Sequence, residues 1–209
     1  MDSMPTNLWP AQPADFEATW KRYFGLMEDL SGRMLRLFAV ALDLPEDFFA
    51  DKVDQHLSSM AANCYPEQPV PPASGQLRVR AHVDFSTLTI LYQDDAPGGL
   101  QAHQRGVGWV DVPYVPGSFV INLGDLMARW TNDRWVATPH RVVNPPPELA
   151  MTRRISLPFF HLPNHDAVIE PIATCVTEAW PARFVPVVAG EWTKSRREYA
   201  SANVGRIPA

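Results

Sequence analysis

The sequence has few cysteines, no long apolar run and no cluster of basic residues, and each absence excludes a class of protein. Two cysteines, Cys64 and Cys175, are too few for a disulfide framework, so we expect a reducing compartment, the cytoplasm. No apolar stretch reaches the roughly 18 residues that span a bilayer, and the N-terminus has no basic-then-apolar signal pattern, so no membrane association is expected. The net charge of −5, without a basic run, gives no electrostatic footprint for nucleic acid.

The composition fits a globular protein with one sizeable core, since 46% of its 209 residues are hydrophobic. Its 21 prolines gather in places, as in the run 145–147, and such clusters indicate rigid loops between strands. We expect three parts: an N-terminal arm and helical region over residues 1–59, a β-rich core over residues 60–175, and a helical C-terminal extension over residues 176–209.

The helical region carries one long apolar stripe. From Ala14 to about Leu57, apolar residues recur at spacings of three and four, which predicts an amphipathic helix whose stripe packs on a core. A short second helix is expected to begin near Pro45. The stripe comprises Phe16, Trp20, Tyr23, Phe24, Met27, Leu30, Met34, Leu37, Phe38 and Ala41.

The β-rich part consists of short runs of β-branched and aromatic residues separated by turn signals, which predicts a sandwich or barrel. Residues 99–103 and 108–112 are expected to form a hairpin, and Ser118–Asn122 a buried strand. The other expected strands are Leu77–Phe85, Thr87–Tyr92, Arg141–Val143 and Ile155–Phe160.

His82, Asp84 and His140 carry the strongest chemical signal. Alternate residues of a strand point the same way, so His82 and Asp84 are expected to share one face of the strand Leu77–Phe85. Two imidazoles and one carboxylate can occupy one face of an octahedral metal and leave the opposite positions open, as in non-heme Fe(II) oxygenases. The other histidines have no carboxylate two residues away in a strand and are expected to be ordinary side chains: His56, His103, His161 and His165.

Around these residues the chain resembles the isopenicillin N synthase-like family of iron(II)- and 2-oxoglutarate-dependent oxygenases. The resemblance covers roughly half of the chain, and its blocks follow the order of the family. They include Asn63-Cys64-Tyr65-Pro66, Ala81-His82-Val83-Asp84-Phe85-Ser86-Thr87-Leu88-Thr89, Gly98-Gly99-Leu100-Gln101, Ile121-Asn122-Leu123-Gly124-Asp125, Trp130-Thr131-Asn132-Asp133, Pro139-His140-Arg141-Val142 and Arg153-Arg154-Ile155-Ser156. The resemblance implies a mainly β fold with flanking helices, in which a double-stranded β-helix (jelly-roll) core follows the long amphipathic helix.

The resemblance also implies a cosubstrate site. Arg154 and Ser156 match the Arg-x-Ser motif of the family, and Asn63 and Tyr65 match its Asn-x-Tyr motif. The Arg154 guanidinium can grip the distal carboxylate of 2-oxoglutarate through two parallel hydrogen bonds, and a hydroxyl two residues along the strand lies on the same face. Arg153 is expected to point away into solvent. Five apolar residues are candidate pocket walls or plain barrel packing: Phe85, Leu91, Val142, Leu157 and Phe159.

The implied function is an Fe(II)- and 2-oxoglutarate-dependent dioxygenase that oxidises an unactivated C–H bond of a small-molecule substrate, by hydroxylation, desaturation or cyclisation, in secondary metabolism. Two alternatives stay open. Arg154 and Ser156 could instead bind a substrate carboxylate in an Fe(II) oxidase of the same family that needs no 2-oxoglutarate. The chain could also be an inactive partner subunit of another oxygenase.

Members of this family usually carry a further N-terminal segment, which this sequence lacks. We therefore expect the barrel flank beside Gln76–Phe85 to be covered by the arm, residues 1–13, or by another chain, as a homodimer or heteromer. The same absence leads us to expect an unusually open mouth of the active site.

Overall fold

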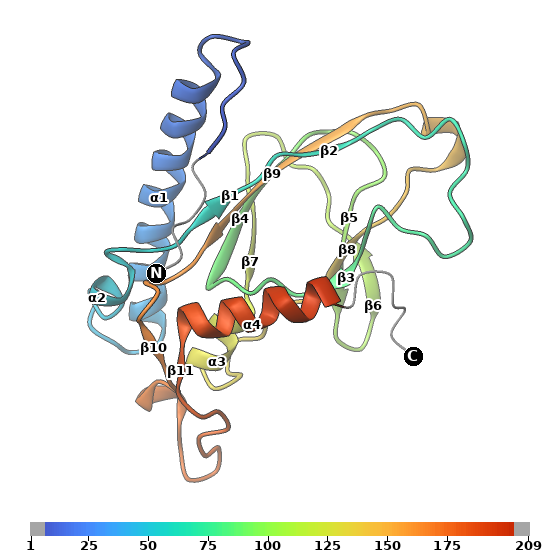
Figure 1. The fold of residues 1–209 in the computed structure, drawn as a ribbon. Coiled ribbons are helices and arrows are strands. Elements are labelled where there is room, and N and C mark those ends of the chain that lie inside the picture. The colour runs from blue at the N-terminus through green and yellow to red at the C-terminus, as the bar shows by residue number, and fades with distance from the viewer. Residues whose placement is uncertain (1–6, 203–209) are drawn as a thin grey trace.

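The structure is a computed structural model that describes residues 7–202. Its first element is the expected long helix, α1 (Phe16–Ala41), which buries Met27, Leu35 and Ala39. Figure 1 shows α1 in blue standing along one side of the strands, and it contacts β9 and β4. A turn beginning at Leu42 leads to the short helix α2 (Ala50–Val53).

The strands form two main antiparallel sheets. The larger sheet has the order β1-β9-β4-β7, with β2 also pairing with β9, and the smaller has the order β3-β8-β5-β6. The strands of the larger sheet are β1 (Ser59–Met60), β2 (Asn63–Tyr65), β4 (Leu88–Gln93), β7 (Val120–Leu123) and β9 (Arg154–His161); those of the smaller are β3 (Val79–His82), β5 (Leu100–Gln104), β6 (Gly108–Asp111) and β8 (His140–Val142). The mainly β fold with flanking helices is confirmed, with the antiparallel sheets of a jelly roll, and β5 and β6 form the predicted hairpin.

The two faces of the larger sheet have different partners. Alternate residues of a strand point to opposite faces of its sheet, and residues paired across neighbouring strands point to the same face. Thr89 therefore shares one face with its partners Phe160 and Asn122, and the residues next to Thr89 and Phe160 point to the other face. Phe159 and Ile90 lie on the face covered by α1, where the Phe24 and Phe159 rings meet edge to face at 5.2 Å. The other face presents polar side chains instead, among them Thr89 and Arg154, and these belong to the candidate site.

The remaining elements follow β7 and β9. Helix α3 (Asp125–Trp130) and the 3-10 turns η1 (Pro147–Leu149) and η2 (Ala173–Cys175) are short, and β10 (Val168–Ile169) pairs with β11 (Val187–Val188). The expected C-terminal helix is α4 (Ala189–Ala202), drawn in red in Figure 1. It is attached to α3 by Arg129, whose guanidinium lies over the rings of Trp192 and Phe184 at 4.2 and 4.7 Å.

Two local expectations were wrong. β7 is the edge of its sheet and Ile121 is 38% exposed, so the stretch Ser118–Asn122 is not a buried strand. β3 ends at His82 after a register shift against β8, so Asp84 lies in the following loop and not on the same strand face. Phe159 packs on α1, which fits barrel packing, the second of its two expected roles, and Leu157 shares that side of β9.

The N-terminal arm is described only from Asn7. In the described part of the arm, from Asn7, the ring of Trp9 lies near Phe16 and beneath the ammonium of Lys21. Trp9 therefore lies against α1. Residues 1–6 lie outside the described residues, so the expected cover of the flank beside Gln76–Phe85 stays a prediction. None of the helices within residues 7–202 has a stretch long and apolar enough to cross a membrane.

Candidate metal and cosubstrate site

His82, Asp84 and His140 converge from three different backbone segments. His82 ends β3, His140 begins β8, and the two are direct partners across the strands, which places their rings 4.3 Å apart. Asp84 reaches them from the loop after β3: its Oδ1 lies 3.8 Å from His82 Nε2 and 3.7 Å from His140 Nε2. One ligand atom from each residue lies within 4.8 Å of the others, the only group of three or more such residues found across residues 7–202.

The backbone orients both imidazoles for metal binding. His82 Nδ1 lies 2.9 Å from the Arg80 carbonyl oxygen, and His140 Nδ1 lies 3.1 Å from that of Thr138. A carbonyl accepts only, so each Nδ1 carries the proton and each Nε2 presents its lone pair to the site. Partial burial of the ring, followed by the nearby His140, lowers the pKa of His82, which favours the neutral, metal-binding form although 40% of the side chain stays exposed.

Asp84 is the buried member of the group, 6% exposed, and two sets of contacts fix it. Its carbonyl oxygen accepts a hydrogen bond from the Asp125 N–H at 2.8 Å, next to Gly124. Its Oδ2 accepts hydrogen bonds from Thr89 Oγ1 at 2.6 Å and Asn122 Nδ2 at 2.7 Å. The protein's own hydrogen bonds therefore hold the carboxylate in place.

The four residues expected to bind 2-oxoglutarate also lie together. Asn63 pairs with Ser156 and Tyr65 with Arg154 across β2 and β9, and the Arg154 guanidinium lies 5.3 Å from the centre of the Tyr65 ring. Arg154 and Ser156 are 1% and 2% exposed, whereas Arg153 is exposed, as predicted.

Arg154 has one satisfied and one unsatisfied nitrogen. Its Nη2 donates to Gln93 Oε1 at 2.9 Å, and its Nη1 is buried without a hydrogen-bond partner. Burial lowers the pKa of the guanidinium, which reflects the cost of keeping this cation away from water. An acceptor brought by a ligand would satisfy the free donor, and a carboxylate suits a guanidinium best.

The two ends of the site lie on one face of one strand. Thr89 contacts Asp84 and Gln93 contacts Arg154, and both side chains come from the inner face of β4. Between them, Leu91 points to the same face, and Val142 shares the side of β8 that carries His140. Whether Leu91 and Val142 line a pocket or pack the barrel stays a prediction.

Sequence reasoning missed the residues that support the site. Thr89, Asn122 and Gln93 are polar residues at alternate strand positions, on the face opposite the core residues Leu88 and Ile90. Asn122 and Thr89 lie within the blocks that resemble the family, so polar residues on an inward strand face were the available signal.

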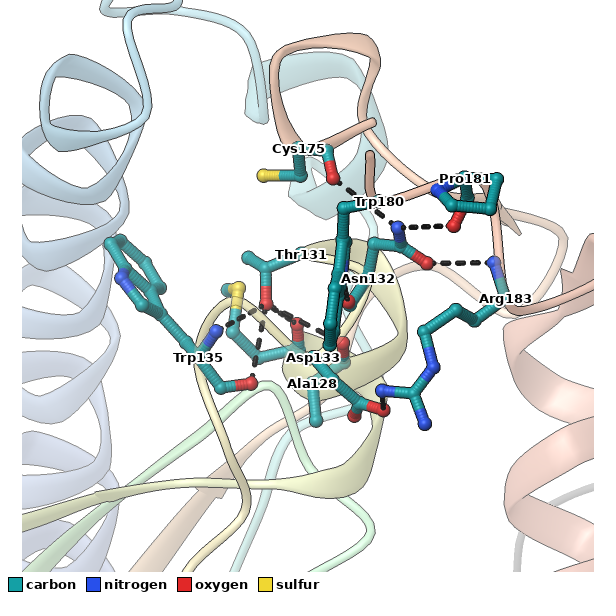
Figure 2. A network of polar contacts seen from close by, with 10 residues as sticks. Ala128, Thr131, Asn132, Asp133, Trp135, Cys175, Trp180, Pro181 and Arg183 are labelled. Atoms are coloured by element: carbon teal, nitrogen blue, oxygen red, sulfur yellow. Dashed lines mark hydrogen bonds and ion pairs between the residues drawn. The ribbon is translucent and has the colours of Figure 1, made fainter. Parts of the chain in front are cut away.

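A second missed feature is the junction between α3 and the segment leading to His140, drawn in Figure 2. Asn132 is fully buried in a left-handed conformation; its side chain donates to the carbonyls of Cys175 and Pro181 and accepts from the Arg183 N–H. Trp180 Nε1 donates to the Asn132 carbonyl at 2.9 Å. These bonds attach the turn after α3 to the C-terminal segment. They thereby fix the position of the residues from which the chain continues to β8.

Comparison with known proteins identifies the family. Residues 57–163, about half of the chain, match the model of the 2OG-Fe(II) oxygenase superfamily. This chain belongs to that superfamily. Within the matched range lie all seven predicted site residues: Asn63, Tyr65, His82, Asp84, His140, Arg154 and Ser156.

Individual superfamily members are similar over most of the chain. Validamycin A dioxygenase of Streptomyces hygroscopicus subsp. limoneus is 32% identical over 174 residues, which are 82% of this chain and 48% of that protein. A homoarginine-6-hydroxylase of Oryza sativa subsp. japonica is 33% identical over 194 residues, 89% of this chain and 57% of that protein. The chain thus spans about half the length of these relatives.

Among solved structures of the superfamily, a full-length Neurospora crassa protein in complex with alpha-KG (2-oxoglutarate) superposes with a TM-score of 0.85 at 30% identity. The match covers 93% of this chain and 61% of that one. The similarity therefore extends well beyond residues 57–163 into the flanking parts of the chain.

Proposed function

We propose that this chain is an Fe(II)- and 2-oxoglutarate-dependent dioxygenase that oxidises an unactivated C–H bond of a small-molecule substrate. One observation carries the proposal: three free ligand atoms at one end of the inner face of β4, and an unpartnered buried guanidinium nitrogen at the other. The first group fits a divalent iron and the second fits the far carboxylate of a 2-oxo diacid.

His82 Nε2, His140 Nε2 and Asp84 Oδ1 would hold the iron. Two neutral imidazoles and a carboxylate suit Fe(II), and the negative charge of Asp84 offsets part of the charge of the metal in a buried place. When bound with 2-oxoglutarate and dioxygen, iron supplies the oxidation of the C–H bond while the oxo acid is converted to succinate and CO2.

Arg154, Ser156, Tyr65 and Asn63 would hold 2-oxoglutarate. Arg154 Nη1 would donate to its distal carboxylate, while the bond to Gln93 keeps the plane of the guanidinium fixed. The hydroxyl of Ser156 lies on the same face of β9, next to Asn63 on β2. The apolar side chains of Leu91 and Val142 lie on the inner faces between the two groups and would help to exclude water.

The reaction outcome would be hydroxylation, desaturation or cyclisation, and we place the chain in secondary metabolism. Support for the substrate class comes from the names of relatives, which refer to validamycin A and homoarginine. Both are small polar molecules, so a small-molecule substrate is proposed for this chain also.

The test compares Arg154→Lys with Arg153→Lys in anaerobic, Fe(II)-loaded protein. Lysine keeps the charge but loses the planar fork, so the free energy of 2-oxoglutarate binding should weaken by about 1.5–3 kcal/mol in Arg154→Lys. The exposed Arg153→Lys control should bind as the unchanged protein does. Calorimetry gives the affinity, and succinate formation in air gives turnover of the oxo acid. Iron-loaded protein that neither binds 2-oxoglutarate nor forms succinate would contradict the proposal and favour the oxidase or the inactive subunit.

The assembly and the compartment are further parts of the proposal. In residues 7–202, β3 pairs with β8 alone, so the other edge of β3 can accept a strand from a second copy or a partner chain. If a second copy or a partner chain pairs with this edge, light scattering in solution would give a molar mass above that of one chain. Cys64 and Cys175 are both free thiols, which supports a reducing cytoplasm.

A further inference from the structure

We propose that Thr89 and Asn122 act as positioning residues that restrict Asp84 to a single metal-binding oxygen. The inference rests on the proposed function, since it concerns how the iron ligand is presented. Neither residue was predicted to belong to the site. Both lie on the inner face of the larger sheet, Thr89 on β4 and Asn122 on β7, directly opposite each other in the strand pairing.

The evidence is the different environment of the two Asp84 oxygens. Oδ2 accepts two short hydrogen bonds, at 2.6 Å from Thr89 Oγ1 and 2.7 Å from Asn122 Nδ2. Oδ1 instead lies between the Nε2 atoms of His82 and His140, at 3.8 and 3.7 Å. The donors come from one side and the imidazoles from the other, so the carboxylate cannot rotate without breaking both hydrogen bonds.

Thr89 is itself held in the donating orientation. Its Oγ1 lies 3.1 Å from Ser86 Oγ, and a hydroxyl has one proton to donate. Because Thr89 donates to Asp84, Ser86 must donate to Thr89. Ser86, Thr89 and Asp84 are 2%, 3% and 6% exposed, so no bulk water competes for these bonds.

The consequence concerns the number of open positions on the metal. Two imidazole nitrogens and one carboxylate oxygen fill three of six octahedral positions and leave three for a two-point oxo acid and dioxygen. A carboxylate binding through both oxygens would fill a fourth position. Thr89 and Asn122 prevent this by engaging Oδ2, and thereby keep the third open position available.

The experiment uses Co(II) alone as a probe of the metal-free protein. Thr89→Val and Asn122→Leu remove one donor each, Thr89→Ser restores the hydroxyl, and Asp84→Ala removes the ligand. Thr87→Val is the matched control: it also loses a buried hydroxyl, two residues before Thr89, but that hydroxyl contacts His161 and not Asp84. Competition titration gives the dissociation constant. The visible absorption of bound cobalt reports its ligands, because the bands shift and change in intensity when a protein oxygen replaces a bound water.

We expect the Co(II) dissociation constant to rise by about tenfold in Thr89→Val and Asn122→Leu, as when partners of metal ligands are lost. The cobalt absorption should change in both, as Oδ2 displaces one water from the metal. Thr89→Ser and Thr87→Val should remain near the unchanged protein. Should Thr89→Val fail to fold, Asn122→Leu on the edge strand decides.

Three results would overturn the inference: folded variants that bind Co(II) as the unchanged protein does, an unaltered cobalt spectrum, or a loss in Thr89→Ser equal to that in Thr89→Val. Failure of the proposed function looks different. In that case the unchanged protein binds Co(II) no better than Asp84→Ala does.

Discussion

The protein contains two close pairs of histidines, and only one pair forms a metal site. The rings of His82 and His140 lie 4.3 Å apart, and those of His56 and His161 lie 5.5 Å apart, near the contact of α1 with the larger sheet. A carboxylate accompanies each pair. Asp84 Oδ1 lies between both Nε2 atoms of the first pair, whereas Glu28 Oε1 contacts His56 Nε2 alone, at 3.1 Å.

The two pairs differ at their Nε2 atoms. In the first pair the backbone takes both Nδ1 atoms and leaves both Nε2 atoms free. In the second, Glu28 Oε1 engages His56 Nε2 at 3.1 Å, and the Thr87 hydroxyl, which donates to the His161 carbonyl, accepts from His161 Nδ1 at 2.7 Å. Proximity of imidazoles is therefore insufficient for a metal site; their free lone pairs must also converge on one point.

The largest expected effect is the difference in Fe(II) affinity between removing Asp84 and removing Glu28, the carboxylates of the two histidine pairs. Asp84→Ala should weaken Fe(II) binding by roughly a hundredfold or more, because a ligand matters more than the partner of a ligand. Glu28→Ala removes the carboxylate of the other pair and should leave the affinity unchanged. Anaerobic titration of both variants with Fe(II) measures this. Equal losses in the two would show that the pairs are not distinct in function.

Gly124→Ala should disturb the contacts of both histidine pairs, since it acts on one loop. That loop carries Asp84, which contacts the first pair, and Thr87, which contacts the second. An added Cβ would lie 2.1 Å from the Ser86 carbonyl oxygen, within the loop that carries both Asp84 and Thr87. We expect the free energy of unfolding to fall by about 3 kcal/mol, the upper part of the range for overpacking. Gly32→Ala, which meets open space on α1, is the control and should stabilise by up to about 1 kcal/mol. Urea unfolding of both variants decides; an equal response at the two glycines would be inconsistent with the tight contact.

The buried pair predicts a pH dependence of stability. Burial, followed by the nearby His56, lowers the pKa of His161 to about 3. The unfolded chain takes up this proton near pH 6.5 and the folded one does not, so stability is complete above pH 6.5 and is lost as pH falls towards 3. As pH falls from 7 to 5, His161 should therefore lower the free energy of unfolding by about 2 kcal/mol.

The matched variant is His161→Asn, whose amide can replace Nδ1 as the partner of Thr87. Unfolding in urea at pH 7 and pH 5 should show a pH-dependent loss that is smaller in the variant by about 2 kcal/mol. An identical loss in both proteins would mean that His161 takes up its proton equally well when folded.

The smallest effect is expected at the Glu28–His56 contact. Both side chains are partly exposed, and such pairs contribute little, so Glu28→Gln should lower the free energy of unfolding by no more than about 0.5 kcal/mol at pH 6. A thermal scan beside the unchanged protein measures it. A loss of several kcal/mol would show that this pair is part of the core and not a surface contact.

Local pattern predicted much of the fold and the chemically active residues. The spacing of apolar residues predicted α1, and alternation with turn residues predicted most strands, because both patterns follow directly from backbone geometry. Resemblance of the motifs predicted two sets of site residues, and the structure brings each set together. They are the metal ligands His82, Asp84 and His140, and the cosubstrate residues Asn63, Tyr65, Arg154 and Ser156. The local pattern was wrong about β7, since the same apolar run forms a central or an edge strand depending on its neighbours.

The sequence by itself determined which side chains could bind a metal and an oxo acid, because residue type fixes charge, lone pairs and donors. Tertiary structure alone decided that Asp84 stands in a loop, that its Oδ2 is taken by Thr89 and Asn122, and that His161 belongs to the core. Each of these depends on contacts between strands far apart in the chain. The free lone pairs of a site are those that the fold leaves unpaired, and pairing is a property of the assembled sheets.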